Sequence, residues 1–116
     1  MPPKVHLQGK RKGVFWMYGI GGLYAGKRML LTPQKIVSMG RWKTNHIVFP
    51  EGTRAVSRFQ CEVLVNDSGD ILVRDSGSTY GTFLGDIRLG KQWVRVKSGD
   101  RISFGNEVFQ FFYGNV

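Results

Sequence analysis

Three short segments of the sequence carry residue types that can hold a phosphate group. Gly40-Arg41 follows an apolar run, Ser57-Arg58 follows a loop, and Thr79 lies in a stretch rich in glycine and serine. A phosphate group brings about −1.5 to −2 charges and three acceptor oxygens. A guanidinium and short hydroxyl side chains suit it, because they offer donors without repelling it. The residue types therefore predict a phosphate site made by Arg41, Ser57, Arg58 and Thr79, provided that the fold brings them together.

A second glycine-rich segment matches a nucleotide-binding motif only in part. The run GGLYAGK, at residues 21–27, has the glycine and lysine spacing of a P-loop, but Arg28 stands where a magnesium-binding Ser or Thr belongs. The motif also requires a helix that opens after it, and Pro33 breaks any helix there. We therefore interpret this segment as a hairpin loop.

The residues that could catalyse a reaction or hold a metal do not form a recognisable set. His6 and His46 have no nucleophile at motif spacing, and Cys61 has no evident partner base. The aspartates fall mostly in turns, where their side chains bond the local backbone, and a zinc site lacks ligands. We therefore expect no catalytic residue, no metal, no cofactor and no enzymatic activity. Cys61 lies in an apolar alternating stretch, which favours a buried small hydrophobe over a reactive thiol.

Positive charge is concentrated in the first part of the chain. The 116 residues carry a formal net charge of +9, and the first 50 hold nine Lys and Arg but no Asp or Glu. Such a bias suits an anionic partner, which could be nucleic acid, an anionic membrane or a phosphorylated protein. Nucleic acid would contact the basic residues 1–13, but no stacking run of the RNA-recognition kind is present, and we expect no nucleic-acid partner. Residues 1–13 alone are interpreted as a flexible, solubilising arm.

The sequence also contains no segment that predicts a membrane or a secretory route. No apolar run approaches the roughly 18 residues of a membrane span, and residues 1–13 lack the apolar middle of a signal peptide. The single cysteine cannot form an internal disulfide. We therefore expect a cytoplasmic protein in a reducing compartment.

Two hairpins are the clearest elements that could position the phosphate-suited residues. Cys61–Val65 alternates apolar and polar residues so that its odd positions can face a core, turn formers fill residues 66–70, and Ile71–Arg74 leads back. Phe83-Leu84 and Ile87–Leu89 flank a two-residue turn and predict a second, tighter hairpin. Both patterns indicate antiparallel pairing.

Short strands account for most of the remaining chain. The 16 glycines and the lack of helix-favouring runs favour an all-β domain with many turns. About ten or eleven strands at close spacing predict a β-sandwich or barrel over residues 14–116. In a sandwich, alternate loops gather at one end, where residues distant in sequence can meet. The other candidate strands are Val14–Tyr18, Lys27–Leu31, Ile36–Met39, Ile47–Phe49, Trp93–Val96, Arg101–Phe104 and Val108–Tyr113.

Short motifs spread along the chain give the sequence a recognisable pattern. In order they are MGR at residues 39–41, NHIVF at 45–49, VSRFQC at 56–61, DSGSTYGTFL at 75–84 and SGDRISFG at 98–105. With these motifs the sequence resembles the forkhead-associated (FHA) domain, a β-sandwich that binds phosphothreonine peptides. The resemblance runs from Val14 to Tyr113 and implies a sandwich of about eleven mostly antiparallel strands.

The resemblance implies a role for each phosphate-suited residue. Arg41 matches the family arginine that pairs with the phosphate, and Ser57 matches the serine that hydrogen-bonds to it. Arg58 follows that serine, where family members often place another phosphate contact. Thr79 occupies the position before the family asparagine, and the residue at that position in family members commonly faces the phosphate. Lys43, in the loop after Arg41, is a candidate for contacting acidic residues that flank the phosphothreonine.

Two positions depart from the family pattern. The family histidine that braces the loop after the serine is replaced by Gln60, whose amide can also donate and accept hydrogen bonds. The family asparagine that clamps the backbone of the bound peptide is replaced by Tyr80, which has one hydroxyl at greater reach. The phosphate half of the site is therefore expected to be intact, while Tyr80 is expected to contact the peptide differently and to weaken or alter its selection.

The function implied by the resemblance is non-enzymatic recognition of a threonine-phosphorylated protein in Ser/Thr-kinase signalling. The alternative is a degenerate FHA domain that acts as a phosphate-independent protein scaffold. The segments VSRFQCEV and GSTYGTFL are more similar to bacterial members of the family than to eukaryotic ones. A bacterial signalling module is thus the expectation from sequence.

Overall fold

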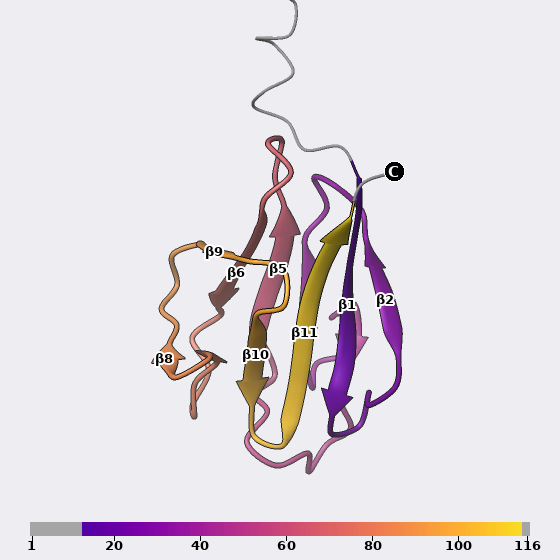
Figure 1. The fold of residues 1–116 in the computed structure, drawn as a ribbon. Coiled ribbons are helices and arrows are strands. Elements are labelled where there is room, and N and C mark those ends of the chain that lie inside the picture. Colours follow the sequence, from indigo (N-terminus) through magenta and orange to yellow (C-terminus); the bar gives the residue numbers. More distant parts are fainter. Residues whose placement is uncertain (1–12, 115–116) are drawn as a thin grey trace, which may run out of the picture.

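Eleven strands in two sheets form the fold of residues 13–114, which are the residues that the computed structural model describes (Figure 1). This part of the chain contains no helix, and so none that could cross a membrane. The strands are β1 (Val14–Gly21), β2 (Arg28–Leu31), β3 (Val37–Gly40), β4 (Ile47–Val48), β5 (Cys61–Val65), β6 (Ile71–Asp75), β7 (Phe83–Leu84), β8 (Ile87–Arg88), β9 (Val94–Val96), β10 (Arg101–Phe104) and β11 (Glu107–Gly114).

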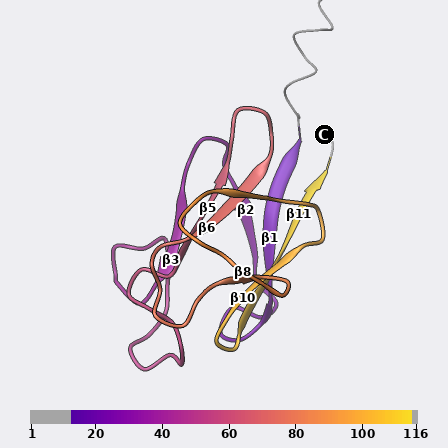
Figure 2. The same cartoon turned by 90° about the vertical axis from the view of Figure 1, so that its left-hand side faces the viewer.

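The two sheets differ in size but are both largely antiparallel. The larger sheet has the order β2-β1-β11-β10-β7-β8, and the smaller one has the order β4-β3-β5-β6-β9. Only β3 and β4 pair in parallel among these strands. Figure 2 shows β3, β5 and β6 in one layer and β1 and β11 in the other. The predicted sandwich of about eleven mostly antiparallel strands is therefore confirmed.

Most strand boundaries lie close to those predicted from the sequence. β5 and β10 have the predicted bounds, whereas β1 continues past Tyr18 into the glycine-rich segment and ends at Gly21. It continues because the eight-residue strand β11 pairs with Gly19 and, after an irregularity, with Gly21. Residues 1–12, which make up most of the predicted basic arm, lie outside the described residues.

Alternation along the strands places the apolar side chains between the two sheets. Cys61, Val63 and Val65 of β5 are buried, as their odd positions predict. Burial raises the pKa of the Cys61 thiol far above its ordinary value, so this residue packs as a small hydrophobe, also as predicted. The largest fully buried apolar side chains are Phe49, Phe104, Phe109, Phe111, Met17, Met39, Ile71 and Ile102.

The segment with partial P-loop spacing is the hairpin loop between β1 and β2, as predicted. The Leu23 amide donates to Oε1 of Glu107 at 2.9 Å, and Glu107 is almost fully buried. A Cβ atom on Gly22 would collide with this carboxylate, and the positive φ of Gly22 also favours glycine. The loop is thus tied to the start of β11 by a carboxylate, which would repel a phosphate.

Three connections meet at the end of the sandwich that lies opposite the described ends of the chain (Figure 1). They are residues 41–46 between β3 and β4, residues 49–60 between β4 and β5, and residues 76–82 between β6 and β7. All the residues predicted to bind phosphate lie in these connections. The sandwich therefore brings together three segments that are far apart in the sequence.

Candidate phosphate-binding site

The backbone after β3 lies directly against the connection that precedes β5. The Arg41 amide donates to the Ser57 carbonyl at 3.0 Å, and the Trp42 amide donates to the Arg58 carbonyl at 3.1 Å. A Cβ atom on Gly40 would lie 2.1 Å from the Arg58 carbonyl oxygen, so this approach requires glycine. These contacts fix the backbone of Arg41 beside that of Ser57.

A buried glutamine joins this connection to residues 76–82. The Gln60 Oε1 accepts from the Ser57 amide at 2.8 Å, while Nε2 donates to the Gly81 carbonyl at 3.0 Å and to Thr82 Oγ1 at 2.9 Å. Gln60 is 0% exposed. Its amide can accept at one end and donate at the other, so this single side chain holds both connections in place.

The Asp75 carboxylate shapes the start of residues 76–82. Its Oδ2 accepts from the amides of Gly77 and Ser78 at 2.8 and 2.7 Å, and its Oδ1 accepts from Ser78 Oγ and Thr82 Oγ1 at 2.6 and 2.7 Å. Burial by itself raises the pKa of Asp75, but the hydrogen bonds from Ser78, Thr82 and Gly77 outweigh burial and hold the pKa below its ordinary value. The ionised carboxylate therefore organises this loop.

Arg41, Ser57 and Thr79 line one hollow of about 250 Å³ at this end of the sandwich. Tyr80 lines it as well, although 67% of Tyr80 is exposed to solvent. No carboxylate occurs among the described residues that line the hollow. Its other lining residues are Gly52, Thr53, Ala55 and Val56. Three of the four residues predicted to bind phosphate therefore converge on a single hollow.

Two of these side chains keep donors available for an anion. Ser57 Oγ accepts from the Thr79 amide at 3.0 Å, which leaves the hydroxyl proton of Ser57 free to donate. The Arg41 guanidinium donates from Nε to the Val56 carbonyl at 2.6 Å and from Nη1 to Glu51, so its Nη2 protons remain available among the described residues. The hollow therefore offers one charged donor and one neutral donor.

Glu51 is a charged neighbour of the hollow that the sequence analysis did not single out. Its carboxylate forms an ion pair with the Arg41 guanidinium, and 74% of its side chain is exposed, against 24% for Arg41. An incoming anion would therefore compete with a solvent-exposed carboxylate for a guanidinium that is already positioned. The sequence held a signal, because Glu51 is the first acidic residue of the chain and the one acid between Arg41 and Ser57.

The other predicted contacts lie outside the hollow. The Arg58 guanidinium stands over the Trp42 ring, 5.6 Å from its centroid, and Arg58 is not among the lining residues. Lys43 is exposed in the connection of residues 41–46 and does not line the hollow either. In residues 13–114 no three His, Cys, Asp or Glu side chains gather as metal ligands would.

The sequence matches the family model of the FHA domain over residues 37–105. The match covers more than half of the chain and includes all three connections of the hollow. The chain therefore belongs to the FHA domain family, as the sequence motifs indicated. FHA domains are generally interaction modules rather than enzymes. No protein of curated function matches the chain in sequence.

Solved structures of FHA domains share the fold of this chain. The FHA domain of the CT664 protein from Chlamydia trachomatis is 17% identical, with a TM-score of 0.74, over 85% of this chain and 96% of that one. An FHA domain of a hypothetical protein from Arabidopsis thaliana is 23% identical, with a TM-score of 0.74, over 93% and 90% of the two chains. EmbR from Mycobacterium tuberculosis, solved with a low-affinity phosphopeptide, is 19% identical, with a TM-score of 0.71, over 97% of this chain and 29% of EmbR.

Proposed function

We propose that this protein is a phosphothreonine-binding interaction module that recognises a threonine-phosphorylated protein in Ser/Thr-kinase signalling in the cytoplasm. The observation that carries the proposal is the convergence of Arg41, Ser57 and Thr79 on one hollow without a carboxylate in its lining. In this function the protein is an adaptor and performs no catalysis.

Each side chain of the hollow has a distinct task in this function. The free Nη2 of Arg41 and the hydroxyl of Ser57 would donate to the phosphate oxygens, and the exposed Thr79 would add its own hydroxyl. Ala55 and Val56 are the apolar aliphatic residues of the lining, and the methyl group of phosphothreonine would pack against them. Serine lacks that methyl group, so this contact supports a preference for phosphothreonine.

Arg58 would join the phosphate only by leaving its position over Trp42. Tyr80, at the rim of the hollow, would contact the peptide on either side of the phosphothreonine. The related structures support the general function, since one was solved to study phosphothreonine-dependent FHA interactions and another contains a phosphopeptide.

The second candidate function is phosphate-independent contact with another protein. The observation that favours it is the ion pair between Arg41 and Glu51, which satisfies part of the guanidinium without any ligand. Tyr80 also lacks the two-ended amide that would hold a peptide backbone. The two candidate functions differ in one measurable property, which is the dependence of binding on the phosphate.

A degenerate phosphothreonine peptide library separates the two functions. Wild-type protein should bind phosphothreonine peptides, should bind their phosphoserine counterparts more weakly, and should not bind unphosphorylated ones. Arg41→Ala should reduce affinity by about tenfold or more, because it removes a charged donor to the phosphate. Arg54→Ala is the matched control, since Arg54 lies in the connection of residues 49–60, between the lining residues Thr53 and Ala55, but does not itself line the hollow.

Two results would contradict the proposal. Equal binding of phosphorylated and unphosphorylated peptides would favour the scaffold function. Equal losses in Arg41→Ala and Arg54→Ala would show that general positive charge, and not the hollow, attracts the peptide.

A further inference from the structure

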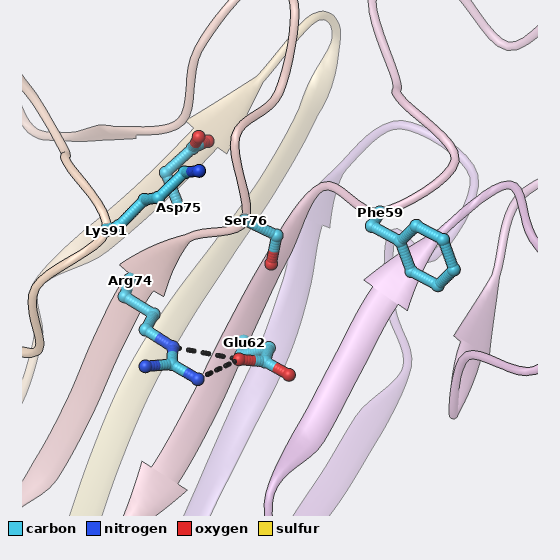
Figure 3. Close-up of a pocket in the computed structure, with 6 residues that line it drawn as sticks. All are labelled: Phe59, Glu62, Arg74, Asp75, Ser76 and Lys91. Atoms are coloured by element: carbon cyan, nitrogen blue, oxygen red, sulfur yellow. Dashed lines mark hydrogen bonds and ion pairs between the residues drawn. The ribbon is translucent and has the colours of Figure 1, made fainter.

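A second and larger hollow lies on the outer face of the smaller sheet. Its volume is about 430 Å³, and Figure 3 shows its lining side chains around the ends of β5 and β6. The two hollows share no lining residue, so the second one is a separate feature of the surface. Its lining residues are Phe59, Glu62, Arg74, Asp75, Ser76 and Lys91.

The connections of residues 49–60 and 76–82 each contribute lining residues to both hollows. Ser57 lines the first hollow and Phe59 the second, while Thr79 lines the first and Ser76 the second. Two or three residues of extended chain span about 7–10 Å. A peptide whose phosphothreonine occupies the first hollow would therefore reach the second one within a few residues.

Both carboxylates of the second hollow already have hydrogen-bond partners. Arg74 donates to Glu62 Oε1 from both Nε and Nη2 at 2.8 Å, and its guanidinium also lies 4.2 Å from the centroid of the Trp93 ring. Figure 3 shows this ion pair on one side of the hollow. The Asp75 carboxylate accepts four hydrogen bonds from its own loop. Glu62 is thus paired with a cation, while Asp75 keeps its negative charge and is held by neutral donors of its own loop.

Lys91 is the charged group of this hollow that has no partner among the described residues. It is exposed and forms no ion pair with any described carboxylate. Its Cε atom lies 3.2 Å from where a Cβ atom of Gly77 would be, so the side chain runs along the loop that separates the two hollows. A free ammonium at this position favours a negatively charged group of the ligand.

An exposed aromatic pair includes Phe59, which lines the hollow across from Lys91. Phe59 is 52% exposed and Trp42 is 42% exposed, with their ring centroids 6.5 Å apart. Figure 3 shows Phe59 on the side of the hollow away from Lys91. Exposed aromatic rings of this kind commonly anchor a partner, because they bury a large apolar area with little loss of side-chain freedom. The hollow therefore combines one free cation with one apolar surface.

We propose that the second hollow is an accessory subsite for residues flanking the phosphothreonine, with an acidic side chain at Lys91 and an apolar side chain on Phe59. This inference rests on the proposed phosphothreonine function and specifies the class of peptide that it selects. It also replaces Lys43 by Lys91 as the lysine that contacts acidic flanking residues.

A set of single-substitution peptides tests this subsite. The reference is a phosphothreonine peptide with alanine at all flanking positions, and each variant peptide carries one glutamate or one leucine at two to four residues from the phosphothreonine on either side. At one or more positions glutamate should tighten binding to the wild-type protein by about twofold to fivefold, as for an exposed ion pair. Lys91→Gln should remove this gain and leave the affinity for the alanine peptide unchanged.

Two further variants complete the design. Leucine should also tighten binding to the wild-type protein at one or more positions, and Phe59→Ala should remove that gain but not the gain from glutamate. Lys97→Gln is the matched charge control, because Lys97 is exposed and lies outside both hollows, and it should keep both gains.

The outcomes separate failure of the subsite from failure of the proposed function. If wild-type protein binds the alanine phosphopeptide but glutamate gives no gain, or Lys91→Gln retains it, the subsite is wrong and the proposed function stands. If Lys43→Gln removes the gain in place of Lys91→Gln, Lys43 is the contact and the subsite is again wrong. If binding does not depend on the phosphate, both proposals fall.

Discussion

The buried residues beneath the phosphate hollow, called its base here, differ sharply in exposure from the residues at its rim. At the base, Gln60 and Thr82 are 0% exposed and hydrogen-bonded to neighbouring loops. At the rim, Tyr80 lies two residues before Thr82 in the same connection and is 67% exposed. Arg58, two residues before Gln60, has its guanidinium on an aromatic ring and not in the hollow. Neighbouring positions in the sequence are therefore under very different constraints.

The difference follows from the cost of burying polar groups. A buried polar atom without a partner costs about 1–3 kcal/mol, so the base tolerates few changes. Exposed rim residues have water as an alternative partner, and changes there alter recognition more than folding. Stability and binding should therefore be separable by substitution.

The largest effect is expected when the base is broken at Gln60. Gln60→Ala leaves the Ser57 amide and the Gly81 carbonyl without their partner and opens a cavity under the loops. We expect the free energy of unfolding, measured with urea, to fall by about 2–4 kcal/mol. Tyr80→Ala is the rim control and should change it by less than about 0.5 kcal/mol. Similar losses in both variants would abolish the distinction between base and rim.

Asp75 should show the next largest effect and a dependence on pH. Asp75→Asn replaces an ionised acceptor of four hydrogen bonds, and we expect a loss of about 1–3 kcal/mol at neutral pH. The pKa of Asp75 is lower in the folded than in the unfolded protein, so its stabilisation is complete above the unfolded pKa and is lost as the pH falls through the folded one. The gap between wild type and Asp75→Asn should thus narrow on acidification below about pH 4. A gap that is constant with pH would show that charge is not the cause.

At the rim, Glu51→Gln should act on binding and not on folding. The substitution removes the charge that competes for Arg41, so the affinity for a phosphothreonine peptide should rise by about twofold to fivefold. Titration calorimetry measures this change. Asp67→Asn removes an equal charge from an exposed turn and controls for the general field. If both variants bind equally well, Glu51 does not compete for the site.

Tyr80→Asn is expected to give the smallest effect. It restores an amide that can both donate to and accept from a peptide backbone, and we expect affinity to rise by about twofold to threefold. The same calorimetric titration detects it, with Tyr80→Phe as a control that removes the hydroxyl without adding an amide. An unchanged affinity in Tyr80→Asn would mean either that Tyr80 contacts the peptide as effectively as asparagine would, or that this position does not contact the peptide.

The sequence predicted those parts of the molecule that depend on the alternation of apolar and polar residues and on residue type. Alternation defined β5 to the residue, because one face of that strand must be buried. Arg41, Ser57 and Thr79 were selected by chemistry and by family resemblance, and they line one hollow. The end of β1 was placed too early, because its glycines pair with a strand about 90 residues away that local pattern cannot reveal.

Side-chain direction in loops was the part that sequence could not supply. Arg58 is a phosphate-suited residue by type, yet its guanidinium stacks on Trp42. The pairing of Arg41 with Glu51 and the exposure of Phe59 depend on how the connections fold back on each other. Those choices are made by tertiary contacts and not by local preference.

The hydrogen bond from the Thr79 amide to Ser57 Oγ has a consequence for the ligand itself. A phosphate that accepts from the Ser57 hydroxyl would extend this bond into a relay that runs from the amide of one loop, through the hydroxyl of another, to the bound anion. Each hydrogen bond of such a relay polarises the next, so a bound phosphate would strengthen the hydrogen bond between the two loops. Binding of the phosphate would then also raise the free energy of unfolding of the protein.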